Sequence, residues 1–212
     1  MFKTQIGPVE SDGDTAYLRP ETAQGIYVNY LLVQGAMRQK LPFGIAQIGK
    51  AFRNEIVARN FIFRTREFEQ MEMQYFVKPG TADQSMADWK AERLAFYNQS
   101  GVDAKKLRFH EHGEGEVAHE AKEAWDIEFE LPFGCSEIEG IHNRTDFDLS
   151  RQQEFSGKKM EIFDQPNDER FLPYIIETSA GLNRMMLAVL SDAYWEDDEN
   201  NRVVMKLHPR IA

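Results

Sequence analysis

Two neighbouring strand-like segments constrain the fold of this chain most. They cover residues 44–55 and 64–77, and the second alternates between apolar and polar side chains. One of its faces, which we expect to join the core, carries Met71, Met73, Tyr75 and Val77. The opposite face carries Phe68, Gln70, Glu72 and Gln74. The pattern predicts an antiparallel hairpin with a loop near residues 56–63.

Positive charge is concentrated around this hairpin. Residues 50–66 carry five basic side chains against Glu55 alone. Arg64 and Arg66 continue the polar alternation of the second strand, and Arg53 shares a face with Glu55 on the first. The hairpin should therefore present arginines, carboxylates and one aromatic ring on one face, which suits an anionic ligand that contains a ring.

Composition limits the class of protein. The 212 residues are 42% hydrophobic with a net charge of −10, which favours one substantial folded domain and argues against non-specific coating of nucleic acid. No apolar run approaches the about 20 residues of a membrane span. Cys135 is the only cysteine, so disulfides and a multi-cysteine zinc site are excluded, and a reducing cytoplasm fits best. The excess of acids at residues 111–130 is typical of a solvated face.

The rest of the chain predicts a mixture of helices and strands. Helices are expected at residues 20–39, around Met86 to Tyr97 with an end near Gly101, and at residues 181–195. Strand-like patterns cover residues 127–142 and 174–179, whereas residues 143–170 should be rich in loops.

Several strings in the sequence resemble one enzyme family. Arg53 and Glu55 in FRNE, followed by Arg64 and Phe68 in FRTREF, resemble motif 2 of class II aminoacyl-tRNA synthetases, and ETSAGLNRMMLAVL resembles motif 3. YLRPETAQGIYVNY, LPFGIAQIGKAFRNEI, REFEQMEMQYFV and EIEGIHNRTDFDL narrow the resemblance to the homodimeric glycyl-tRNA synthetases. It covers essentially the whole chain, with motif 2 at about 44–77 and motif 3 at about 174–195.

The resemblance implies an α+β fold with a mainly antiparallel sheet flanked by helices. The catalytic core would comprise residues 1–79 and 131–212, with an insertion at 80–130. The family's motif 1 and anticodon-binding domain are expected to be absent, with Met1 at the place of an internal methionine. The full-length protein would be a cytoplasmic homodimer, not bound to a membrane, that acts in protein biosynthesis.

The resemblance also implies the activity. Glycine and Mg²⁺-bound ATP would form glycyl-adenylate and pyrophosphate, and glycine would then pass to the 3′ end of tRNA(Gly). Arg53 would bridge the α-phosphate and the glycine carboxylate, Arg64 would hold the distal phosphates, and Phe68 would stack under the adenine. Arg184, the third expected catalytic residue, would lie against the other face of the ring or near the γ-phosphate. The expected ATP-binding residues are Arg53, Asn54, Glu55, Phe63, Arg64, Thr65, Arg66, Glu67, Phe68, Glu137, Ile138, Gly181, Leu182, Asn183 and Arg184.

A second group of residues would recognise glycine. The resemblance places three carboxylates around the ammonium group with Ser179 beside them, and Arg144 would anchor these acids or the substrate carboxylate. Larger amino acids would be excluded because the pocket is full. The expected glycine-binding residues are Glu21, Phe68, Glu69, Gln70, Met71, Glu72, Arg144, Glu177, Thr178, Ser179, Ala180 and Gly181. Glu137 is the first candidate for Mg²⁺ and Glu177 the second, although Glu139 shares the alternation of Glu137 and is an alternative functional acid.

Other hypotheses stay open at this point. A biotin or lipoate type ligase is the second enzyme class, but such ligases lack the RPETAQG and ETSAG strings. A non-catalytic synthetase-like module would be expected to lose Arg53, Arg64 or Arg184, and all three are present. His110, His112 and His119 form a weak zinc pattern without a fourth ligand. The sequence favours a structural role for His142 and a packing role for Cys135.

Overall fold

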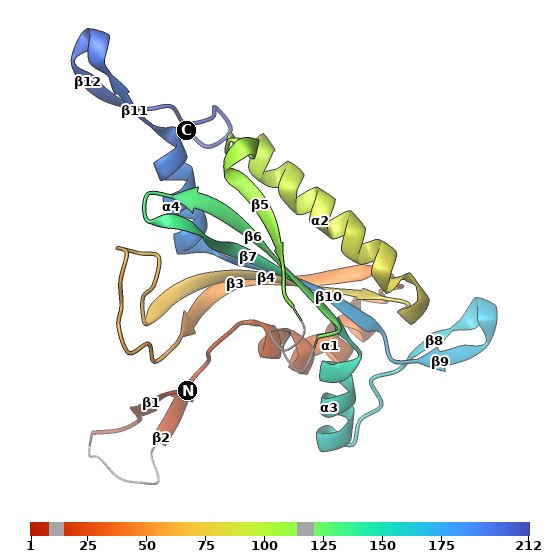
Figure 1. The fold of residues 1–212 in the computed structure, drawn as a ribbon. Helices are drawn as coiled ribbons and strands as arrows, with labels where there is room; N and C mark the ends of the chain where they lie inside the picture. The colour runs from red at the N-terminus through yellow and green to blue at the C-terminus, as the bar shows by residue number, and fades with distance from the viewer. Residues whose placement is uncertain (9–14, 114–120) are drawn as a thin grey trace.

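A six-stranded antiparallel sheet forms the centre of the molecule (Figure 1). The computed structural model describes residues 1–8, 15–113 and 121–212. The strand order is β3-β4-β10-β7-β6-β5. The strands are β3 (Phe43–Phe52), β4 (Glu67–Val77), β5 (Leu107–Glu111), β6 (Glu123–Leu131), β7 (Gly134–Thr145) and β10 (Tyr174–Gly181). The helices are α1 (Ala23–Met37), α2 (Ala82–Gln99), α3 (Phe147–Ser156) and α4 (Leu182–Ala193).

Helices cover both faces of the sheet, which confirms the predicted α+β class (Figure 1). Helices α1 and α3 pack on one face, where Tyr30, Phe43 and Phe76 form an aromatic cluster with ring centroids 4.7–6.2 Å apart. Helices α2 and α4 pack on the other face against a second apolar cluster that includes Ile127 and Ile141. Within the described residues, no helix is both long and apolar enough to cross a membrane.

The predicted hairpin is confirmed, but its loop is longer than expected. Strands β3 and β4 pair from Phe43 opposite Phe76 to Phe52 opposite Glu67. Four charged residues that were predicted to extend these strands therefore lie in the connecting loop, residues 53–66: Arg53, Glu55, Arg64 and Arg66. Hydrogen bonds within the loop replace the ladder: the Arg66 guanidinium donates to the Glu55 carbonyl at 3.0 Å. They order the loop where regular pairing ends.

The polar face of β4 is more buried than its apolar face, contrary to the sequence prediction. Gln70, Glu72 and Gln74 are buried, whereas Met71 and Met73 are only half-buried. The polar groups are tolerated because neighbouring elements satisfy them: Tyr27 on α1 donates to the Gln74 side chain at 2.8 Å. Burial of this face follows from tertiary partners that alternation within one strand does not reveal.

Helix α1 begins at Ala23, three residues later than predicted. The backbone N–H of Thr22 donates to the Glu72 carboxylate at 2.9 Å, and the Thr22 hydroxyl donates to the same oxygen. These contacts bind the residue before the helix to the sheet, so the helix starts beyond it. The same contacts bring the preceding segment, with Glu21, to the edge of the polar face.

The expectation that residues 143–170 are rich in loops is wrong for α3. Its buried residues are only Asp148 and Leu149, so it has little apolar periodicity to detect. The buried ion pair of Asp148 with Arg144 holds it against the sheet. In the described part of the chain, three two-stranded antiparallel sheets complete the fold: β1 (Phe2–Gln5) with β2 (Thr15–Leu18), β8 (Ile162–Asp164) with β9 (Glu169–Phe171), and β11 (Tyr194–Asp197) with β12 (Arg202–Met205).

The predictions for α2, β10 and α4 are confirmed. Residues 80–130, expected as an insertion, contribute α2, β5 and β6, and the two strands belong to the same sheet as the flanking strands. Helix α2 packs on β7 and β10, with Met86 and Tyr97 fully buried. This segment therefore shares the core of the rest of the chain.

Candidate active site

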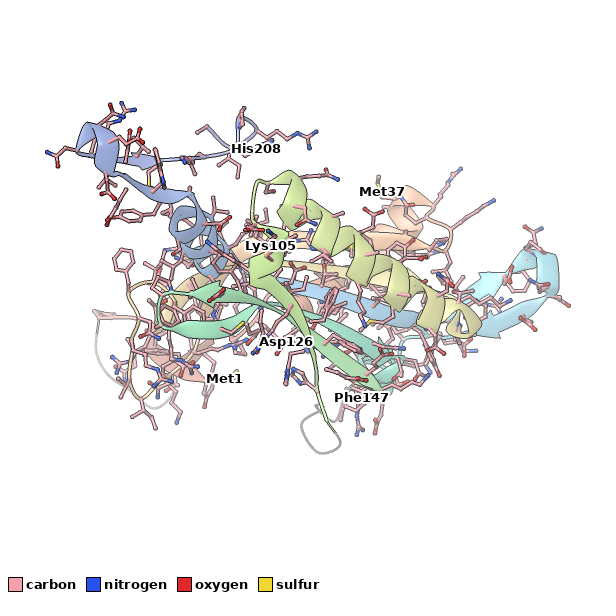
Figure 2. All side chains as sticks on the ribbon, turned by 45° about the horizontal axis from the view of Figure 1, so that its top comes forward. Met1, Met37, Lys105, Asp126, Phe147 and His208 are labelled. Atoms are coloured by element: carbon pink, nitrogen blue, oxygen red, sulfur yellow. The ribbon has the colours of Figure 1, made fainter. Side chains whose placement is uncertain are left out.

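The candidate site is a cavity of about 330 Å³ over the polar face of the sheet. It is bounded by the β3–β4 loop, by β4, β6, β7 and β10, and by the start of α4. Asp126 on β6, labelled in Figure 2, is one of its lining residues. Seventeen of the residues predicted from the sequence line it: Glu21, Arg53, Glu55, Phe63, Arg64, Thr65, Phe68, Gln70, Glu72, Glu137, Ile138, Arg144, Glu177, Ser179, Gly181, Asn183 and Arg184.

The remaining predicted residues do not line the cavity. They are Asn54, Arg66, Glu67, Glu69, Met71, Thr178, Ala180 and Leu182. Strand alternation explains half of them, because Glu69, Met71, Thr178 and Ala180 point away from the face that carries Gln70 and Ser179. Glu67 forms an ion pair with Lys50 outside the cavity. A contiguous motif in a strand thus contributes only alternate side chains to a pocket.

Sequence reasoning missed seven lining residues. They are Ile62, His112, Ala121, Ala124, Asp126, Gly140 and His142. A signal existed for Gly140 and His142, because both share alternation with Arg144, which the resemblance had placed in the site. No comparable signal marked Asp126, which enters the site only because β6 pairs with β7.

The zinc pattern is not realised in the described part of the chain. No group of three or more potential ligands is arranged there to hold a metal ion. The His112 Nε2 atom instead lies 2.8 Å from Asp126 Oδ2. His119 lies outside the described residues.

Arginines line the end of the cavity nearest the β3–β4 loop. The Arg53 guanidinium stacks on the Phe68 ring at 5.3 Å and donates to the Pro20 carbonyl at 3.2 Å. Among the described residues, no carboxylate forms an ion pair with Arg53. Arg64 donates to Glu55 at 3.3 Å, but its Nε atom is buried without a hydrogen-bond partner in the described structure. A guanidinium group has N–H donors and no acceptor, so these two arginine side chains need an anion or a carbonyl oxygen as hydrogen-bond acceptor.

Arg184, at the start of α4, is the third arginine that lines this part of the cavity. Its guanidinium stacks on the Phe63 ring at 4.3 Å and donates to the Phe63 carbonyl at 3.2 Å. It also donates to the carbonyl and the carboxylate of Glu137, at 3.0 and 3.2 Å. The arrangement stacks a planar cation on an aromatic ring at the cavity, which suits a ligand with both phosphate and ring.

Carboxylates line the other end of the cavity. Glu72 accepts from Ser179 Oγ and from Gln70 Nε2, both at 2.9 Å, in addition to the bonds from Thr22. Burial and the nearby charge of Glu177 raise the pKa of Glu72, although the bonds from Thr22 and Ser179 act against this. Burial and Glu177 likewise raise the pKa of Glu21. Two carboxylates without a full counter-charge are therefore held together.

Glu177 lies behind these two acids in a saturated network. It accepts from Gln74 at 2.6 Å, from His142 at 2.8 Å and from Arg144 at 3.3 Å. Burial alone would raise the pKa of Glu177, but the bond from His142 and the charge of Arg144 outweigh it and lower the pKa to about 2. Glu177 is therefore ionised under ordinary conditions.

Arg144 anchors the acidic end. Its guanidinium donates to both oxygens of Asp148, at 2.7 and 3.1 Å, as well as to Glu177. Burial acts to lower the pKa of Arg144, but the Glu177 and Asp148 carboxylates outweigh it and raise that pKa. Of the two roles expected for Arg144, anchoring the acids is the one that this geometry favours.

The three acids considered for Mg²⁺ or catalysis have different surroundings. Both oxygens of Glu177 already accept hydrogen bonds inside the fold, so Glu177 does not fit a metal ligand. Glu139 is buried on the opposite face, where Arg93 and Tyr97 donate to it, so its role is structural. Glu137 is half-exposed at the cavity and fits as one carboxylate donor beside phosphate oxygens.

Known proteins resemble this chain at two levels. The sequence matches the tRNA synthetase class II core domain (G, H, P, S and T) over residues 2–193. It is 58% identical to a glycine-tRNA ligase of Treponema denticola, over the whole of this chain and 49% of that protein. It is 56% identical to a glycine-tRNA ligase of Chlorobaculum tepidum, over the whole of this chain and 45% of that protein.

The chain therefore spans about half the length of these curated relatives. A solved structure of Giardia lamblia prolyl-tRNA synthetase in complex with prolyl-adenylate superposes with a TM-score of 0.70. It covers 90% of this chain and 36% of that protein at 18% identity. This second likeness concerns the fold alone.

Proposed function

Because this chain belongs to the class II tRNA synthetase core family, we propose that its cavity binds glycine and ATP and joins them as glycyl-adenylate. The observation that carries the proposal is the polarity of the cavity along the strands. Arg53, Arg64 and Arg184 come from the β3–β4 loop and the start of α4, next to where β4 begins and β10 ends, whereas Glu72 and Glu177 lie farther along these two strands. This order matches a glycyl-adenylate whose ammonium group lies toward Glu72 and whose phosphate, between the glycyl group and the adenosine, lies toward the arginines. Identity of 50–58% to proteins named glycine-tRNA ligase supports glycine as the amino acid.

The proposed chemistry follows from the charges. An oxygen of the glycine carboxylate attacks the α-phosphorus of ATP, and the bond from that phosphorus to the β-phosphate bridging oxygen breaks, releasing pyrophosphate. Negative charge collects between two anions, and Arg53 would neutralise it because its planar fork can serve both. Arg64 would hold the outgoing phosphates, and the Phe68 ring would stack under the adenine. Mg²⁺, when bound through Glu137 and phosphate oxygens, would supply further neutralisation of the phosphate charge.

The acidic end would bind the glycine ammonium group. Glu72, held by Thr22 and Ser179, and Glu21 supply negative charge that the fold offsets only in part. An ammonium group bound there would form charge-assisted hydrogen bonds and lower the electrostatic cost of keeping both acids ionised. Glu177 would act from behind, since its oxygens are already bonded.

The proposal extends to the whole protein of this kind. Glycine would pass from the adenylate to the 3′ end of tRNA(Gly), in a homodimer that works in the cytoplasm. The names of the curated relatives support the tRNA substrate. A non-catalytic module and a biotin or lipoate type ligase are the rival functions. The first is disfavoured because all three arginines line the cavity, and the second because Glu21 and Ser179, from RPETAQG and ETSAG, line it too.

Calorimetry with a non-hydrolysable glycyl-adenylate analogue tests the proposal without requiring turnover. The analogue, glycylsulfamoyl-adenosine, should bind the chain with one-to-one stoichiometry. Adenosine alone should bind more weakly, because it lacks the ammonium and the phosphate-like group. Equal affinities for the two compounds would show that neither end of the cavity recognises its expected group.

Substitution of Glu72 by glutamine should weaken binding of the analogue by about 10 to 100-fold at neutral pH, because one charge-assisted bond to the ammonium is lost. The wild-type affinity should also fall as the pH decreases through the raised pKa of Glu72, since the protonated acid attracts the ammonium less. Glu72→Gln should flatten this dependence. ATP affinity serves as the control and should change by less than about twofold, because no phosphate-binding arginine is altered. Equal loss for both ligands would assign Glu72 a structural role.

A further inference from the structure

Gly140, on β7, lies in the middle of the polar face, and its lack of a side chain leaves space above the sheet there. It is paired with Asp126 on β6 and with Ser179 on β10, and it lines the cavity. A Cβ atom at Gly140 would lie 2.9 Å from Cε1 and 3.0 Å from Nε2 of His142. The distal half of the His142 imidazole thus occupies the space directly above Gly140, where a side chain would otherwise stand.

Two neighbours, Glu177 and His112, fix this imidazole. His142 Nδ1 lies 2.8 Å from Glu177 Oε1, and because that carboxylate is ionised, Nδ1 carries the proton and donates it. On the other side the His112 ring meets the His142 ring at a steep angle, with centroids 6.4 Å apart. His112 is itself bonded to Asp126. The ring is therefore held from the β10 side and from the β6 side above a glycine floor.

The fixed ring stands beside the ammonium end of the cavity. Ser179, the cross-strand partner of Gly140, donates to Glu72 at 2.9 Å. Glu177, which holds the ring, is the neighbouring acid behind the same end. In an amino acid, the side chain and the ammonium group are bonded to the same α-carbon, so the side chain must lie next to the ammonium group. Space next to Ser179 and Glu72 therefore decides which substituents fit.

We propose that His142 is a specificity-determining residue, whose imidazole over Gly140 fills the room that the side chain of alanine or a larger amino acid would need. The inference rests on the proposed function, and it assigns the exclusion of larger substrates to this pair of residues. His142 then has two separable tasks: its Nδ1 atom orients Glu177, and the distal ring atoms fill space.

Two substitutions separate these tasks. His142→Asn places an amide N–H where Nδ1 lies, so the bond to Glu177 is kept, but it removes the ring atoms above Gly140. His142→Phe keeps a ring of similar volume and cannot donate to Glu177. Calorimetry with glycylsulfamoyl-adenosine and alanylsulfamoyl-adenosine gives the discrimination ratio for each variant, and thermal unfolding verifies that each is folded.

Discrimination against the alanyl compound should fall by about 10-fold or more in His142→Asn, as expected for one methyl group that gains room. It should be kept in His142→Phe, even if both compounds bind that variant more weakly. An unchanged ratio in His142→Asn would overturn the proposal, and so would equal losses in the two variants. If the wild-type chain fails to bind the glycyl compound, the proposed function itself is wrong, and that result is distinct from the other two.

Gly140→Ala provides an independent variant should His142→Asn not fold. The added methyl group must displace the His142 ring, because contacts of 2.9 and 3.0 Å are too short for a Cβ atom. The ring should move toward the substrate space, so affinity for the glycyl compound should fall by about 10-fold or more while ATP affinity changes by less than twofold. Unchanged glycyl affinity in Gly140→Ala would show that the space above Gly140 is not part of the amino-acid pocket.

Discussion

Replacement of Arg53 by lysine should lower the rate of glycine activation by about 10²-fold or more, the loss expected when one well-placed donor to the transition state is removed. Lysine keeps the positive charge but presents a single ammonium in place of the planar fork. It cannot serve the α-phosphate and the amino-acid carboxylate at once. It also cannot place a guanidinium plane over the Phe68 ring, where the Arg53 Cζ atom lies 5.3 Å from the ring centroid.

Pre-steady-state measurement of glycyl-adenylate formation would quantify the effect. Arg170→Lys is a matched control, because Arg170 on β9 also stacks on a phenylalanine ring, Phe163, at 4.8 Å but does not line the cavity. That variant should retain wild-type rates within about twofold. Wild-type kinetics in Arg53→Lys would remove Arg53 from the centre of the proposed chemistry.

Replacement of Arg144 by methionine should lower the free energy of unfolding by about 3–5 kcal/mol, because it leaves Asp148 and Glu177 buried without their cation. Urea denaturation measures the change. Arg151→Met, which breaks the exposed ion pair with Glu154 on α3, is the control and should change stability by about 0.5 kcal/mol or less. Similar losses in the two variants would show that the buried network contributes no more than a surface pair.

Acid pH should narrow the difference between Arg144→Met and the wild type. In the wild type the lowered pKa of Glu177 contributes stability that is present above its unfolded value of 4.5 and is lost as the pH falls toward about 2. In the variant, burial is no longer outweighed by the arginine charge, so the pKa of Glu177 should rise and this contribution should shrink. The two unfolding free energies should therefore converge between pH 4.5 and pH 2.

Local sequence patterns correctly predicted some of the strands and helices. The sequence pattern was sufficient to place β4 and α4, and the resemblance to motifs 2 and 3 pointed to Arg53, Arg64, Phe68 and Arg184, which line the cavity. Helix α3 was missed because a buried ion pair, Arg144 with Asp148, holds it in place of an apolar stripe. The pattern of hydrophobic residues does not reveal a contact between two charged side chains, so it could not predict this helix.

Adjacency between strands set the other limit. His142 lies opposite Glu177, and Gly140 opposite Ser179, only because β7 pairs with β10 in one register, with an irregularity near Ile175. A shift by one residue would point His142 away from the cavity. The burial of Gln70 and Gln74 likewise depends on α1 and β10. Sequence order alone could not supply these relations.

Exchange of labelled pyrophosphate into ATP measures the proposed reaction itself, because it reports reversible formation of the adenylate at this cavity. We expect exchange that requires glycine, that alanine supports far less, and that Arg53→Lys lowers by about 10²-fold. Absence of glycine-dependent exchange in a chain that binds glycylsulfamoyl-adenosine would rule out glycine activation at this cavity, as would exchange that proceeds equally without any amino acid.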